Sequence, residues 1–118
     1  MTSPLRDRLR AALPAAMKSR ERTAVAALRS ALATLDNAEA VNPEEGTAVG
    51  QAIEQVAIGV GATEVERRVL TEPEVTALIQ REVSERESAA ADYDRAGQGE
   101  RAMQLRAEAQ VLAAHLAG

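Results

Sequence analysis

The sequence predicts an all-α protein of about four main helices arranged as helical hairpins or a bundle, and three observations support this. Apolar residues make up 46% of the 118 residues, yet Phe and Trp are absent and Tyr93 is the only aromatic residue. Ala and Leu, which dominate, have high helix propensity, whereas a sheet would need the β-branched and aromatic residues that are scarce here. Apolar residues also recur at helical spacing, and helix start and stop signals flank them. At this length we expect a single domain over residues 1–118 with a modest core.

The first helix begins at Ser3 and Pro4, which suit the N-cap and the first helical position. One face then carries the apolar residues Leu5, Leu9, Ala12, Leu13 and Ala16. Pro14 lacks a backbone donor and clashes with the preceding turn, so we expect a kink or a break near Leu13. The alternative is a short helix over 3–13 followed by a new turn that begins at Pro14.

Residues 20–40 form the clearest predicted helix. Its apolar stripe consists of Ala24, Val25, Leu28, Ala31, Leu32, Leu35 and Ala38. Arg22, Arg29 and Asp36 step by seven on the opposite side and should face solvent or a partner. Asn42-Pro43 should end the helix, because the residue before proline is pushed out of the α region.

A long connection follows over residues 41–70, and such loops are usually functional or disordered. It contains four of the seven glycines, with a short apolar segment at 48–58 that would form a turn or two of helix and an extended stretch at 62–70. Gly59-Val60-Gly61 lacks the Lys followed by Ser or Thr of a phosphate-binding P-loop, and Glu64 brings negative charge. We interpret this segment as a hinge between helices.

Two further helices should form an antiparallel hairpin. Thr71 and Glu74 make a capping box, and the helix after them presents the apolar residues Val75, Leu78, Ile79, Val83, Ala90 and Tyr93. Gly97 is the predicted stop, because a left-handed residue costs Gly little. The last helix, from about Glu100, places Ala102, Leu105, Ala109, Leu112 and Leu116 on one side, and the short link at 96–99 makes the pair antiparallel.

No residue pattern predicts a catalytic site, a metal site or a cofactor. Cysteine is absent, which excludes disulfides, thiolate metal sites and Cys nucleophiles. His115 is the only histidine, and we interpret it as solvent-exposed without a partner. Asp92 and Asp94 flank Tyr93 on a helix, so they point in different directions around a core Tyr. Glu82, Glu85, Arg86 and Glu87 are predicted to form a solvated helix face with local ion pairs.

Charge is unevenly distributed along the chain. The net charge is −4, but residues 1–35 carry seven Lys and Arg against Asp7 and Glu21, a balance of +5, and residues 36–118 carry −9. An acidic chain is a poor general nucleic-acid binder, yet its basic N-terminal segment can form a local contact surface. The alternative is that these Arg residues only solvate helix faces.

The N-terminus does not resemble a signal peptide, because charged residues interrupt any apolar run there: Arg6, Asp7, Arg8 and Arg10. No stretch approaches the ~18 apolar residues of a membrane span. We therefore expect a soluble, cytoplasmic protein without a membrane partner.

Three segments together resemble the YqeY-like family, the GatB/YqeY group that is also described as related to the GatB component of aspartyl/glutamyl-tRNA amidotransferase. They are "MKSRERTAVAALRSALATLDNAEA" (17–40), "LTEPEVTALIQREVSERESAAADYDRAG" (70–97) and "RAEAQVLAAHL" (106–116). The family's Met-Lys followed by Arg, its Leu-Arg, its Ala-Gly between helices and its Glu-x-x-x-Leu tail correspond to residues 17–20, 28–29, 96–97 and 108–112. The resemblance covers most of the chain outside 41–69, and the order and spacing of the motifs are fairly specific.

The resemblance implies an all-α protein linked to glutamine-dependent tRNA amidotransferases, but it supplies no catalytic residue. Family members usually continue into a small three-helix tail domain, the element associated with tRNA in the amidotransferases. This chain stops at Gly118, where that domain would begin, so we expect either a short member or a truncated chain that lacks the tail. The segment at 41–70 resembles the longer connection of some members.

The leading hypothesis is a non-catalytic helical module that binds tRNA or a tRNA-handling, translation-related protein. The contact candidates are Lys18, Arg20, Arg22 and Arg29 in the basic N-terminal segment. One alternative, implied by the resemblance, is carbon–nitrogen ligase activity with glutamine as amido-N-donor. Another is a self-associating scaffold, a homo-oligomer whose Ala-rich faces pair between chains.

Overall fold

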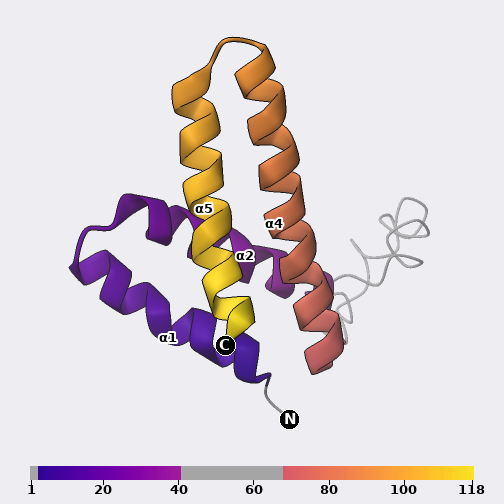
Figure 1. The fold of residues 1–118 in the computed structure, drawn as a ribbon. Helices are drawn as coiled ribbons and strands as arrows, with labels where there is room; N and C mark the ends of the chain where they lie inside the picture. The colour runs from indigo at the N-terminus through magenta and orange to yellow at the C-terminus, as the bar shows by residue number, and fades with distance from the viewer. Residues whose placement is uncertain (1–2, 41–67) are drawn as a thin grey trace, which may run out of the picture.

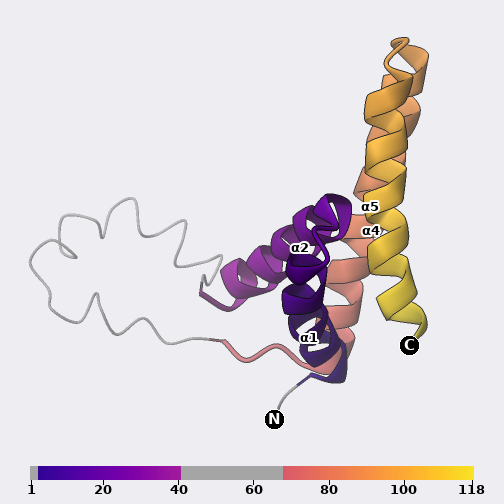
Figure 2. The ribbon, with the colours of Figure 1, turned by 90° about the vertical axis from the view of Figure 1, so that its left-hand side faces the viewer.

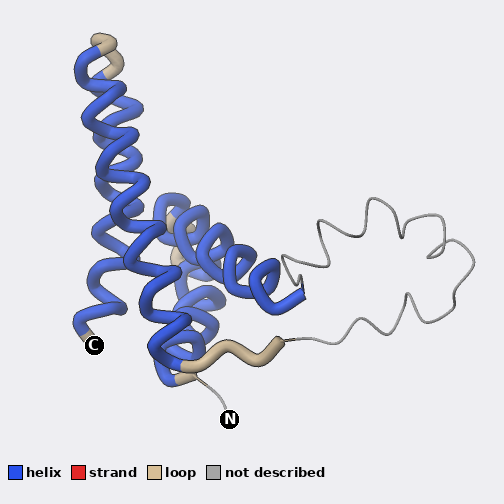
Figure 3. Tube along the Cα trace, turned by 90° about the vertical axis from the view of Figure 1, so that its right-hand side faces the viewer, coloured by secondary structure: helices blue, strands red, loops and turns tan. Residues whose placement is uncertain are grey.

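The computed structural model describes residues 3–40 and 68–118 and shows four α-helices in two antiparallel hairpins (Figure 1). The first hairpin consists of α1 (Pro4–Lys18) and α2 (Arg22–Ala40), and the second of α4 (Glu72–Arg95) and α5 (Gly99–Ala117). The first hairpin packs against the lower half of the second, so the turn between α4 and α5 projects beyond it (Figure 2). The predicted all-α class is confirmed, and the described residues contain no strand (Figure 3).

Side-chain caps lie at the start of α1 and of α4, as the sequence predicts. The Ser3 hydroxyl accepts a hydrogen bond from the Arg6 amide at 3.1 Å, and Pro4 follows at the first helical position. At α4 the capping box is complete, because Glu74 N donates to Thr71 Oγ1 at 3.3 Å and Thr71 N donates to Glu74 Oε1 at 2.9 Å. Each cap satisfies backbone donors that have no partner within the helix.

Two predicted helix boundaries are wrong. The helix α1 does not break near Leu13 but continues through Pro14 to Lys18. Pro14 and Arg10, the residue whose carbonyl Pro14 cannot bond, both lie on the exposed side, where water can hydrate that carbonyl. The helix α2 begins at Arg22, two residues later than predicted, because Arg20 lies in the turn with a φ of 58°.

The core is aliphatic and lies where the two hairpins cross. The largest fully buried side chains are Leu5, Leu9, Leu28, Leu35, Val75, Ile79 and Leu112. They come from all four helices and were predicted to face inward. Buried Ala residues, such as Ala27 and Ala31 of α2, fill the remaining contacts, so the helices approach closely without aromatic side chains.

A buried polar network between α2, α4 and α5 contradicts the prediction that Glu82 and Arg86 lie on a solvated face. Arg86 donates to Glu82 on its own helix at 2.7 Å and to Glu108 of α5 at 3.1 Å. Thr34 of α2 donates to Glu82 at 3.0 Å, and Gln104 donates to Glu108 at 3.1 Å. Burial acts to lower the pKa of Arg86, but the hydrogen bonds to both carboxylates outweigh it and raise that pKa.

A second ion pair joins the start of α1 to the end of α2. Arg6 donates both terminal nitrogens to the carboxylate of Glu39, at 2.6 and 2.9 Å, and reaches the exposed Asp36 at 3.4 Å. The hydrogen bond to Glu39 raises the pKa of Arg6 despite the opposing effect of burial. Glu39 also accepts from the backbone amide of Leu70, so it fixes the entry of the chain into the second hairpin.

The predictions for Asn42-Pro43, the short segment at 48–58 and the hinge at 59–61 lie outside the described residues. Of the extended stretch predicted at 62–70, the structure describes residues 68–70, which are neither helix nor strand. None of the described helices is long and apolar enough to cross a membrane.

Replacing Arg86 by Met should lower the free energy of unfolding by about 3 kcal/mol, because two buried carboxylates then lose their cation. Equilibrium urea unfolding at pH 7 measures this. Arg81→Met is the matched control: Arg81 pairs with Glu85 only at 4.0 Å on the exposed surface, so its loss should cost less than about 0.5 kcal/mol. Equal effects of the two substitutions would contradict a structural role of the buried network.

Glu74 makes the stability of α4 depend on pH. The backbone hydrogen bond from Thr71 lowers the pKa of Glu74, and the Arg68 charge acts in the same direction. Its ionised form therefore stabilises the fold above the ordinary Glu pKa of about 4.3, and this contribution disappears as pH falls through the lower folded value.

Glu74→Gln keeps the shape of the capping box without the charge. Wild type should exceed the variant in urea midpoint at pH 7, and the difference should shrink as pH falls below the ordinary Glu pKa of about 4.3. A difference that persists unchanged at pH 3 would exclude the titration of Glu74 as its cause.

Candidate basic nucleic-acid interface

The site is built on the tight turn between α1 and α2. Arg20 N donates to Met17 O at 3.1 Å and Glu21 N donates to Ala16 O at 3.0 Å, which is the paired hydrogen-bond pattern of a Schellman helix end. Arg20 occupies the left-handed position of this motif with a φ of 58° and is the only described residue other than Gly with a positive φ. That conformation is uncommon for a side chain larger than Asn or Asp.

The turn between α4 and α5 has the same hydrogen-bond pattern, with Gly, the residue that adopts a left-handed conformation most easily, at the left-handed position. Gln98 N donates to Tyr93 O at 2.8 Å and Gly97 N to Asp94 O at 3.0 Å, and Gly97 has a φ of 79°. The predicted role of Gly97 as the stop of α4 is thus confirmed. The left-handed position is therefore Gly at the end of α4 and Arg at the end of α1. The left-handed conformation costs a residue with a side chain about 1–2 kcal/mol, so Arg20 is strained and Gly97 is not.

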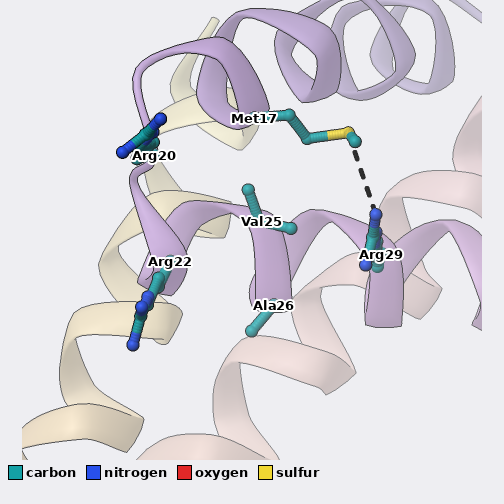
Figure 4. Close-up of a pocket in the computed structure, with 6 residues that line it drawn as sticks. All are labelled: Met17, Arg20, Arg22, Val25, Ala26 and Arg29. Carbon is teal, nitrogen blue, oxygen red and sulfur yellow. Dashed lines mark hydrogen bonds between the residues drawn. The ribbon is translucent and has the colours of Figure 1, made fainter.

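An open hollow of about 650 Å³, which we call the basic hollow, lies beside the Arg20 turn. Three of the four predicted contact residues line it together with three apolar residues, and Figure 4 shows all six: Met17, Arg20, Arg22, Val25, Ala26 and Arg29. Arg20 and Arg22 lie at one end and Arg29 at the other, with Met17 and Val25 between them. The site therefore has a cationic rim and an apolar floor.

Helical spacing explains why α2 presents this surface. Arg22 and Arg29 are seven residues apart, which places them two turns apart on one face, and Val25 and Ala26 lie between them on that face. The turn brings Met17 of α1 over this face, where Arg29 Nη2 approaches Met17 Sδ at 3.9 Å. The contact holds the thioether and the guanidinium together at the edge of the floor.

Lys18 does not line the basic hollow. It lies exposed in the last turn of α1, next to the same turn, where a cation is favourable at the negative end of the helix dipole. The structure thus brings Arg20, Arg22 and Arg29 together around one cavity and leaves Lys18 beside it.

The four cations at this end lack ion pairs, whereas most other cations in the part of the chain that the structure describes have one. Lys18, Arg20, Arg22 and Arg29 form no ion pair there, whereas six other Arg residues are paired with carboxylates: Arg6, Arg68, Arg81, Arg86, Arg95 and Arg106. Glu21, the acid between Arg20 and Arg22, is exposed and likewise unpaired within the described ranges. The four positive charges therefore remain available for a negatively charged partner.

The apolar floor was missed by the sequence analysis, which assigned Val25 to the core stripe of α2 and gave Met17 no role. Val25 is half-buried and packs against the core at one edge while it lines the basic hollow at the other. Met17 keeps 47% of its surface exposed, although Met is apolar. The seven-residue step of Arg22 and Arg29 indicates the face, but the sequence pattern gives no signal for the turn that brings Met17 over it.

Tyr93 and His115, which the sequence also pointed to, differ in burial from the prediction. The prediction that Tyr93 is a core residue is wrong: it lies half-buried, with the Arg101 guanidinium carbon 5.8 Å from its ring centroid. His115 is half-buried, not fully exposed, and its backbone carbonyl accepts a hydrogen bond from Arg8 at 2.9 Å. Among the described residues, no three His, Asp or Glu side chains gather as metal ligands.

No protein-family model matches this chain, and no curated protein or solved structure is significantly similar to it.

Replacing Arg20 by Gly should raise the free energy of unfolding by about 0.5 kcal/mol. Relief of the left-handed strain, about 1–2 kcal/mol, exceeds the greater entropy that Gly gives the unfolded chain. The Arg20 side chain makes no hydrogen bond or ion pair with the described residues, so little is lost in the folded state. Thermal unfolding measures the change.

Gly97→Ala is the matched control at the other turn. Its added Cβ meets no atom within 4 Å, so only the left-handed conformation opposes it, and the expected loss is about 1 kcal/mol. If Arg20→Gly destabilised the protein as much as Gly97→Ala does, the strain assigned to Arg20 would be refuted.

Proposed function

We propose that this protein is a non-catalytic helical module that binds RNA, and tRNA in particular, through Lys18, Arg20, Arg22 and Arg29. The observation that supports the proposal is the gathering of cations without a described carboxylate partner around one open hollow. The sequence resemblance to proteins linked with tRNA amidotransferases supports the choice of RNA among anionic partners. Amide transfer would need a catalytic constellation, which none of the described residues suggests.

Guanidinium groups suit this role for a physical reason. Arg presents planar donors that bind phosphate oxygens in pairs and remains charged at all physiological pH values. Three Arg residues on the rim of the hollow can therefore neutralise phosphates on either side of it. Each neutralised phosphate releases condensed counterions, so the affinity should fall steeply with salt.

The rest of the described chain restricts where RNA binds. Residues 36–40 and 68–118 carry 11 acids against six Arg, a balance of −5, and several of these Arg residues pair with neighbouring acids, as Arg95 does with Asp92 and Arg106 with Asp94. A polyanion is repelled by this surface and attracted to the α1–α2 turn. The charge distribution therefore favours one orientation of the bound RNA.

A triple variant, Arg20→Gln with Arg22→Gln and Arg29→Gln, should bind unfractionated tRNA much more weakly than wild type. The slope of log K against log[salt] should become shallower by about 2, because each lost phosphate contact removes about 0.7. Fluorescence anisotropy with labelled tRNA between 25 and 200 mM salt (roughly the range over which such contacts weaken) measures both quantities.

The matched control removes the same charge elsewhere, with Arg81→Gln, Arg95→Gln and Arg106→Gln on the exposed surface of the second hairpin. It should retain nearly the wild-type slope. If wild type bound tRNA without salt dependence, or if both triple variants lost binding equally, the proposal would fail, and a protein partner would be sought for the same surface.

A further inference from the structure

We infer that the basic hollow accepts one unpaired nucleotide of the RNA, with its base on the floor formed by Met17, Val25 and Ala26 and its flanking phosphates on the rim arginines. This inference rests on the proposed function and specifies its substrate class. It predicts a preference for a bulged or single-stranded nucleotide over a regular duplex.

The lining of the hollow carries the inference. Phosphate contacts alone need only cations, and a regular duplex presents a charged, hydrated backbone to the protein. A floor of Met17, Val25 and Ala26 between the arginines gains nothing from such a surface and is matched by a flat, weakly polar base. The volume of about 650 Å³ lies within the roughly 300–1,000 Å³ range of small-molecule pockets, which suits one nucleotide.

Two lining residues are positioned to hold a base. Met17 has an unbranched, polarizable side chain that adapts to flat surfaces, and about half of its surface is exposed. Arg29 approaches the Met17 thioether at 3.9 Å, so its guanidinium lies at the edge of the floor. Such a guanidinium plane can stack on an unpaired base, which is a common mode of RNA recognition.

The turn supplies the opposite edge of the site. Because Arg20 is left-handed, its side chain leaves the turn instead of continuing the face of α1, and Figure 4 shows it at the end of the hollow opposite Arg29. Strained residues that persist in a fold are concentrated at binding sites. The nucleotide would thus lie between Arg20 and Arg29, with a phosphate available to each.

The test compares the binding of two RNAs to the full chain: a perfect duplex, and the same base pairs with one additional, bulged nucleotide whose base is the fluorescent 2-aminopurine. Wild type should bind the bulged RNA about fivefold more tightly than the duplex, since a base placed on a side-chain platform contributes a few-fold or more. The fluorescence of 2-aminopurine should change on binding, which reports the new environment of that base.

Met17→Ser should remove most of the preference for the bulge and the fluorescence change, without altering the slope of log K against log[salt]. Met17→Leu should restore both. Met103→Ser is the matched control, because Met103 is 70% exposed on α5 and does not line the hollow. It should leave affinity, preference and fluorescence unchanged, and thermal unfolding confirms that all three variants fold.

The outcomes separate this inference from the proposed function. Equal affinity for duplex and bulged RNA, or a preference that survives Met17→Ser, would overturn the nucleotide site and leave phosphate binding intact. The absence of any salt-dependent RNA binding would overturn both. If polyglutamate of equal charge displaced the bulged RNA as well as unlabelled bulged RNA does, the hollow would be a site for an acidic peptide, and the inference would again be overturned.

Discussion

Arg86 lies between Glu82 and Glu108 and joins α4 to α5, and the hydroxyl of Thr34 on α2 binds the same Glu82, so this buried network also links the two hairpins where they cross. A core of Leu, Ile, Val and Ala stabilises the contact, but small aliphatic side chains permit several registers between helices. The network disfavours the others, because a shift by one turn would leave buried charges without partners. Thr34 and Gln104 extend the restriction by binding the outer oxygens of the two carboxylates. Apolar burial thus supplies the driving force, and the ions select the arrangement.

The basic hollow does not depend directly on this network, because all of its lining residues belong to the first hairpin and the turn between α1 and α2. Arg6 and Glu39 connect the far ends of α1 and α2, and the Arg20 turn connects the near ends. Between these two attachments the helices are held side by side. Met17 is therefore held over the face of α2 that carries Arg22 and Arg29. Of the six lining residues, only Arg20 lies in the turn; the other five lie on α1 or α2, which keeps them in fixed relation.

Most of the fold could be predicted from local signals. The N-cap at Ser3, the capping box at Thr71 and the stop at Gly97 each act within one helical turn, so the sequence pattern is sufficient to find them. The errors concern residues whose environment is set by distant parts of the chain. Pro14 is tolerated because its side of α1 is exposed, and that exposure depends on where the second hairpin packs.

The candidate site shows the same division. The face of Arg22 and Arg29 is predictable from their spacing, and the charge balance indicates the end of the molecule where the basic hollow lies. The left-handed Arg20 is not predictable, because Gly is the residue that normally marks such a turn. Likewise, Glu82 and Arg86 read as an ordinary i,i+4 pair until Glu108 and Thr34 are placed against them. The spacing of residues in the sequence shows which side chains share a helix face, whereas the burial of that face depends on which helix packs against it.

The projecting half of the α4–α5 hairpin has a consequence for the dynamics of the protein. Its fully buried apolar residues are Ala90 and Ala102, whereas the buried Leu and Ile residues belong to the core cluster formed with α1 and α2. These two small side chains and the half-buried Tyr93 remove less apolar surface from water than the core does, so this part of the hairpin should fray as a unit while the crossing stays intact. Its backbone amides would then exchange with solvent through a partial opening that leaves the rest of the molecule folded.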